Sequence, residues 1–74
     1  PMSNVFTEPH SVAVRESICA IDQLIKKVSD RTAQAADAAR AGENNQAIGC
    51  LVGTDVMLDS ARALYTAAIA LHKL

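Results

Sequence analysis

The sequence predicts an all-α protein: an antiparallel two-helix hairpin that self-associates into a four-helix bundle. Three observations support this fold class. Two long apolar stretches have helical spacing, a glycine-polar segment separates them, and the second stretch has more apolar surface than one partner helix covers. The chain has 74 residues, half of them hydrophobic, with Phe6 and Tyr65 as its only aromatic residues. Chains this short rarely build a sufficient core alone, so oligomerisation is one of the usual supplements.

The first helix is predicted over about residues 8–41, after a tail, residues 1–7, that we expect to be flexible. Thr7 is the favoured N-cap because an acid and a proline then fall in the first turn, and Ser11 is an alternative cap. Residues of one stripe recur at alternating spacings of four and three, which keeps them facing a partner. The stripe comprises Val14, Ile18, Ile21, Ile25, Val28, Thr32, Ala35 and Ala39.

Residues 42–44 form the predicted turn, and the second helix follows over about residues 45–72. Gly42 suits the left-handed conformation that ends many helices, and Asn44 or Asn45 is a favourable N-cap. One stripe of the second helix comprises Met57, Ala61, Leu64, Ala68 and Leu71. A second stripe lies about 100° round the helix and comprises Leu51, Leu58 and Tyr65.

Two glycines lie within the predicted second helix. Gly49 and Gly53 are four residues apart, and an interior glycine costs about 1 kcal/mol relative to alanine. Pairing the two helices around the turn places both glycines opposite the alanine-rich end of the first helix. We therefore expect close packing of the two backbones at this end of the hairpin.

The apolar surface that remains after hairpin closure predicts a homo-oligomer, with a dimer as the simplest form. A larger oligomer or a hetero-complex would bury this surface equally well. The predicted oligomer core comprises Ile18, Ile21, Ile25, Val28, Leu51, Met57, Leu58, Leu64, Ala68 and Leu71.

Composition excludes several classes of function. Seven basic and eight acidic residues are spread along the chain and give a net charge of −1, with no basic block beyond Lys26-Lys27. Nucleic-acid binding and electrostatic docking to a membrane both call for basic surface, so neither is expected. No apolar run approaches the length of a membrane span. We expect a soluble cytoplasmic protein.

No motif in the chain indicates catalysis, a cofactor or a metal site. There is no nucleophile–base pair, no glycine-rich phosphate loop after a strand, and no cluster with metal-ligand spacing. Cys19 and Cys50 are isolated, and a hairpin separates them by about 45 Å at 1.5 Å per residue, which excludes a disulfide between them. His10 and His72 are expected near the open end of the hairpin as solvated residues. The chain is therefore not expected to be an enzyme.

A charged group on the second helix is the best candidate for a partner-binding surface. Asp55, Asp59 and Arg62 share one side of the helix, flanked by Ile48, Val52 and Ile69, with Tyr65 as an aromatic anchor at the seam. An apolar centre with a charged rim is typical of protein interfaces. For the charges themselves the sequence favours a solvated surface with an Asp59–Arg62 ion pair, like the Asp22–Lys26 pair expected on the first helix, over a contact site.

Three classes of function follow from these features. The leading prediction is a small regulatory or adaptor protein that binds a larger protein through its helices, as an inhibitor, anti-activator or chaperone. The architecture resembles that of anti-activators, secretion chaperones and phage-encoded inhibitors only at the level of the fold. The runner-up binds or sequesters a small, nucleotide-like anion in a pocket at an oligomer interface, lined by Arg62, Tyr65 and Thr66. The third class is a structural subunit of an assembly.

Overall fold

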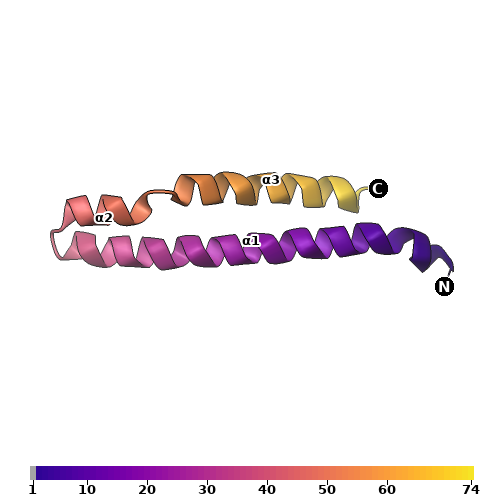
Figure 1. The fold of residues 1–74 in the computed structure, drawn as a ribbon, viewed down its shortest axis with the longest axis horizontal. Coiled ribbons are helices and arrows are strands. Elements are labelled where there is room, and N and C mark those ends of the chain that lie inside the picture. The colour runs from indigo at the N-terminus through magenta and orange to yellow at the C-terminus, as the bar shows by residue number, and fades with distance from the viewer. Residues whose placement is uncertain (1) are drawn as a thin grey trace.

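The hairpin predicted from the sequence is present in the computed structural model, which describes the backbone of residues 2–74 and the side chains of residues 9–74. Three helices follow one another: α1 (Met2–Arg40), α2 (Asn44–Leu51) and α3 (Thr54–His72). Helices α2 and α3 run back along α1 as one bent arm (Figure 1). The all-α class and the antiparallel hairpin are therefore confirmed, with a second helix that is broken rather than continuous.

Helix α1 begins at Met2, ahead of the predicted start at residue 8, and includes Pro9. The side chain of the predicted cap Thr7 lies outside the described residues, and the flexibility of residues 1–7 stays a prediction. The helix ends in a hydrogen-bonded turn around Gly42, whose φ of +80° is left-handed. The amide of Gly42 donates to the carbonyl of Ala39, and the amide of Glu43 donates to that of Ala38. These two bonds define a Schellman motif, which confirms the predicted role of Gly42.

The contact between the two arms follows a heptad pattern. Along α1 a row of buried and half-buried positions alternates spacings of three and four, which is the pattern of a coiled-coil seam. The row comprises Val14, Ser17, Ile21, Leu24, Val28, Arg31, Ala35 and Ala38, and the half-buried Val12, Ala13, Ala20 and Ala36 lie beside it. Every second residue of the predicted stripe belongs to this seam. The residues between them, Ile18, Ile25 and Thr32 among them, are exposed, so the prediction that one stripe of α1 packs within the hairpin was half wrong.

The seam of the returning arm continues through the break between α2 and α3 without losing its spacing. Its residues are Ala47, Cys50, Thr54, Met57, Ala61, Leu64, Ala68 and Leu71. The stripe predicted from Met57 to Leu71 therefore packs against α1. The smallest side chains are the most buried: Ala35, Ala38, Ala47, Ala61 and Ala68 are all at most 8% exposed. Among the described side chains none is fully buried, so the hairpin has a thin seam rather than a core.

The break between α2 and α3 replaces the close glycine contact that the sequence predicted. Gly53 has a φ of +91°, a left-handed conformation that side chains rarely adopt. A Cβ on Gly49 would meet nothing within 4 Å. The prediction that both glycines pack tightly against α1 was therefore wrong: Gly53 provides the backbone turn, and Gly49 lies on an exposed part of α2.

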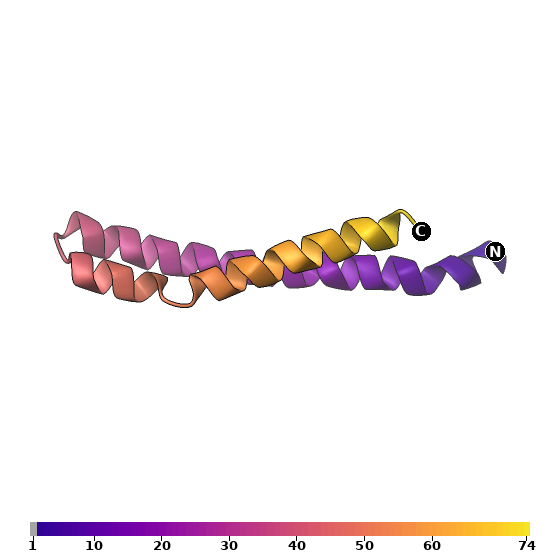
Figure 2. The same ribbon diagram turned by 90° about the horizontal axis from the view of Figure 1, so that it is seen from above.

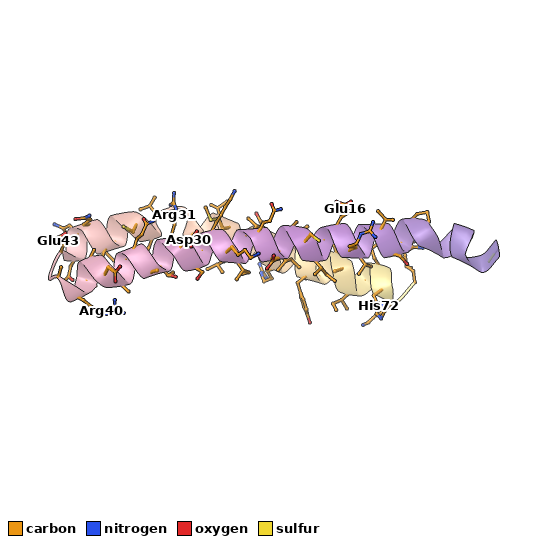
Figure 3. The ribbon with its side chains drawn as sticks, turned by 90° about the horizontal axis from the view of Figure 1, so that it is seen from below. Glu16, Asp30, Arg31, Arg40, Glu43 and His72 are labelled. Atoms are coloured by element: carbon orange, nitrogen blue, oxygen red, sulfur yellow. The ribbon has the colours of Figure 1, made fainter. Side chains whose placement is uncertain are left out.

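Side chains complete the hydrogen bonding at this break. The guanidinium of Arg31, half-buried in the α1 seam, donates to the carbonyl of Val52, and a Cβ on Gly53 would lie 3.6 Å from the same guanidinium. The hydroxyl of Thr54 donates to the carbonyl of Leu51 at 2.7 Å. Figures 2 and 3 show the break and the position of Arg31 near it. The carbonyls of Leu51 and Val52 at the end of α2 thus accept side-chain hydrogen bonds, and a cation lies at the negative end of its dipole.

Candidate interaction face

One side of the hairpin carries apolar side chains that the fold leaves exposed. On α1, Ile18 is 55% exposed and Ile25 is 45% exposed. Thr32 and Ala39 continue the same row at seven-residue spacing, and each member directly follows a seam residue in the sequence. The row therefore runs along one edge of the seam for most of the length of the helix.

The returning arm carries a matching row. Leu51, Leu58 and Tyr65 also directly follow seam residues, and they are 37%, 48% and 61% exposed. In an antiparallel helix pair, positions that directly follow the seam on the two helices share one side. The two rows together form a surface that we name the apolar face: Ile18, Ile25, Thr32, Ala39, Leu51, Leu58 and Tyr65.

Two hollows on this face confirm that the rows lie on the same side. The turn-end hollow, of about 550 Å³, is lined by residues of α1 and α2: Thr32, Ala35, Ala36, Ala39, Asn44, Ala47, Ile48 and Leu51. The open-end hollow, of about 450 Å³, is lined by residues of α1 and α3: Val14, Ile18, Ile21, Tyr65, Ala68, Ile69 and His72. Each hollow combines one part of the α1 row with one part of the row on the returning arm.

The opposite side of the hairpin has a different composition. The positions that directly precede the seam residues there are small or polar on both arms: Ala13, Ala20, Lys27 and Gln34 on α1, and Gln46, Gly53, Ser60 and Ala67 on the returning arm. No large apolar side chain occurs among them. The hairpin therefore has one face suited to further helix packing and one suited to water.

The predicted partner-binding residues divide into two groups. Ile48, Tyr65 and Ile69 line the hollows of the apolar face. Val52, Asp55, Asp59 and Arg62 are exposed on α3 and on the segment before it, and line neither hollow. We name this second group the outer ridge. The sequence had suggested one surface, whereas the fold places two types of surface on the same arm.

The charges on the hairpin surface are mostly solvated. Asp22 and Lys26 form the expected ion pair at 2.9 Å, and the hydrogen bond from the Lys26 ammonium to the Asp22 carboxylate, together with the charge of that carboxylate, raises the pKa of Lys26. Asp37 and Arg40 form a second exposed pair at 2.9 Å. Among the described side chains these are the only salt bridges, so the Asp59–Arg62 pair expected from the sequence was wrong. Asp59 and Arg62 are thus exposed side by side on the outer ridge.

The polar group proposed for a small-ligand pocket does not enclose a cavity within one chain. Arg62 and Thr66 are exposed, and the Thr66 hydroxyl donates to the Arg62 carbonyl of its own helix at 3.1 Å. Tyr65 lies beside them on the apolar face, where its neighbours around the hollow are mainly aliphatic. The three residues therefore belong to two different surfaces.

Residues with metal or redox chemistry are dispersed. Cys19 is exposed, while Cys50 packs against the cluster of Ala35, Ala38 and Ala47, and both thiols are free. His10 and His72 line a small hollow of about 170 Å³ at the open end. Within the described residues no group of three histidine, cysteine or acidic side chains could hold a metal ion. None of the described helices combines the length and apolar character needed to cross a membrane.

Comparisons with known proteins add no relative: no family model, no curated protein and no solved structure matches the chain.

Proposed function

We propose that this protein is a small regulatory or adaptor protein that acts by helix-mediated binding to a larger protein, with two hairpins assembled as a four-helix bundle. The observation that carries the proposal is the apolar face. It presents two rows of mainly apolar side chains, one tyrosine among them, on one side of a hairpin in which no described side chain is fully buried.

The dimensions of the hairpin support a second layer of helices. The radius of gyration is 17.4 Å, compared with about 11 Å for a compact chain of this length. The accessible surface is 5608 Å², about 1,200 Å² more than a compact monomer of this mass exposes. A standard interface removes about 800 Å² from each partner. The excess surface of the hairpin is therefore as large as the area that an interface of ordinary size covers on one partner.

The chemistry of the two surfaces supports a division of roles. Large aliphatic side chains on the apolar face favour self-association, because burial of apolar area is its main driving force. The outer ridge combines the exposed Val52 with Asp55, Asp59 and Arg62, whose charges form no salt bridge with any side chain that the structure describes. Charged groups at the rim of an interface contribute mainly to specificity and association rate. The outer ridge thus suits recognition of the larger protein.

Self-association is tested with a matched pair of variants on α3. Leu58→Glu places a charge on the apolar face, whereas Val56→Glu places one two residues away at a position that is 64% exposed and lines none of the hollows. Sedimentation equilibrium should show dimers for the wild type and Val56→Glu and a shift to monomers for Leu58→Glu, with helical circular dichroism retained in all three. Equal association of Leu58→Glu and the wild type would contradict the proposed use of this face.

The larger protein is sought by affinity purification from the native source, followed by calorimetric titration of each purified candidate. A regulatory or adaptor role predicts a defined stoichiometry and weaker binding by Asp59→Lys and Arg62→Glu, through charge mismatch. Wild-type affinity in both variants would exclude the outer ridge as the binding surface for the larger protein.

Native mass spectrometry distinguishes the small-ligand binder from the regulatory or adaptor protein, since a co-purifying small anion would favour the ligand-binding class. Growth of ordered assemblies with concentration would favour the structural class.

A further inference from the structure

The two ends of the apolar face differ in shape. At the open end, Ile18, Tyr65 and Ile69 project around the smaller hollow, and Tyr65 is the most exposed of the three at 61%. At the turn end, the larger hollow is lined by the exposed Ile48 (64%) and Leu51 (37%) together with four alanines: Ala35, Ala36, Ala39 and Ala47. We name the open end, with its tyrosine, the projecting end, and the turn end, whose hollow is lined mainly by small side chains, the recessed end.

The spacing of the two ends fits a simple symmetry. The turn-end hollow spans residues 32–39 of α1, and the open-end hollow spans residues 14–21. Their centres lie about 27 Å apart along the helix at 1.5 Å per residue. The midpoint falls close to Ile25, and Leu58 occupies the same level on α3 because the two arms run antiparallel. A two-fold axis that lies in the plane of the contact at this level, perpendicular to the long axis of the hairpin, turns the two faces toward each other and exchanges the two ends.

We infer that a second copy of the chain covers the apolar face in the antiparallel orientation, with the two turns at opposite ends, so that Tyr65 of each copy fills the turn-end hollow of the other. This inference rests on the self-association proposed above and specifies its geometry. In this arrangement the projecting end of each copy meets the recessed end of the other, and Ile25 and Leu58 pack around the axis.

Packing density favours this orientation over the alternative. With the two turns at the same end, the two alanine-lined hollows would face each other and leave a void, while the larger side chains of the two open ends, Ile18 and Tyr65 among them, would occupy the same space. Voids forfeit dispersion contacts, and protein interiors contain few of them. The tyrosine hydroxyl also needs a polar neighbour when the ring is buried. Asn44 and Thr32 at the turn-end hollow provide one.

The orientation is measured directly with spin labels. In a Cys19→Ser, Cys50→Ala background, a single Glu43→Cys label reports on the turn. Pulsed electron–electron double resonance should give a separation of about 45–50 Å between the labels of the two copies in the antiparallel dimer. With turns at the same end the labels would lie within about 25 Å of each other. A label at Lys26→Cys, near the axis level, should give a short distance in either orientation and serves as the control for an intact dimer.

The outcomes separate the inference from the proposal on which it rests. A long Glu43 distance together with a short Lys26 distance supports the antiparallel dimer. Short distances at both sites would overturn the orientation while leaving self-association intact. Absence of any distance between copies, together with a sedimentation mass of one chain, would overturn self-association itself.

Size changes at the proposed contact provide a second test. Tyr65→Ala removes the projecting group, and Ala39→Leu narrows the hollow from an exposed position of α1. Each should raise the dissociation constant of the dimer at least tenfold. Ala33→Leu, an exposed alanine outside both hollows, is the matched control and should leave the constant unchanged. Equal dissociation constants for Ala39→Leu and Ala33→Leu would contradict the filling of the hollow.

Discussion

Individual residues determine where the hairpin bends. Gly49 and Gly53 look equivalent in the sequence, since both interrupt an apolar stretch four residues apart. The structure separates them by backbone conformation: Gly53 alone is left-handed, at a φ of +91°, and Gly49 is helical. A local sequence cannot reveal this difference, because the seam spacing continues unchanged through the break.

Alanine substitution should therefore have opposite effects at the two glycines. Gly53→Ala should lower the free energy of unfolding by about 1 kcal/mol, because a side chain strains the left-handed conformation. Gly49→Ala should raise it by up to about 1 kcal/mol through helix propensity, since the added Cβ meets nothing within 4 Å. Urea denaturation at one fixed protein concentration measures both. If Gly49→Ala destabilised the protein as much as Gly53→Ala, the result would support the close contact at Gly49 that the sequence predicted.

Arg31 shows how a charged residue can occupy a seam position. Its guanidinium binds the Val52 carbonyl at the break, so its side chain packs along the seam while its charge reaches the end of α2. Sequence periodicity does not predict a seam position for Arg31, because the larger apolar residues Ile18 and Ile25 occupy the neighbouring row.

Replacement of Arg31 tests the bond at the break. Arg31→Met keeps the aliphatic packing and removes the donor, so the free energy of unfolding should fall by about 1 kcal/mol. Hydrogen exchange should accelerate first at the amides of residues 52–57. Arg15→Met, at an exposed position of the same helix, is the matched control. A uniform acceleration along α3 would indicate that Arg31 has no local role at the break.

At the scale of the helices, the sequence predicts that the two arms pack against each other, but it does not predict which side of α1 forms the contact. Helix α1 carries suitable residues in three positions of each heptad, and Val14, Ile21, Val28 and Ala35 belong to either possible stripe. Size alone favours the stripe through Ile18 and Ile25. The hairpin instead uses Ser17, Leu24 and Arg31, which leaves the larger side chains on the apolar face. The turn at Gly42 could be predicted, because a Schellman motif has a local signature.

The ion pair on the exposed side of α1 has a measurable consequence for titration. The Asp22 carboxylate accepts a hydrogen bond from the Lys26 ammonium and raises the pKa of Lys26. Because the folded-state value is raised, the contribution of this pair is present below the ordinary lysine pKa and is lost as the pH rises through the raised value. Nitrogen-detected NMR titration should show a lower midpoint in Asp22→Asn. An unchanged Lys26 midpoint in Asp22→Asn would contradict the Asp22–Lys26 ion pair.

At the scale of the whole molecule, the hairpin is a rod with extents of 60 × 17 × 13 Å. The sequence predicted surplus apolar surface, and the fold locates it on one side, with the outer ridge beside it. The sequence could not separate these two surfaces, because Ile48, Val52 and Ile69 all flank the charged residues in helical projection. Which of these three residues line the hollows depends on which side of the returning arm packs against α1.

The mass of the wild-type chain in solution tests the central claim most directly. With a second copy covering the apolar face, as proposed, sedimentation equilibrium at micromolar concentration should give twice the chain mass of 7.8 kDa. A well-folded species of 7.8 kDa across the micromolar range would contradict the account, because the apolar face would then be stable in water without a second copy.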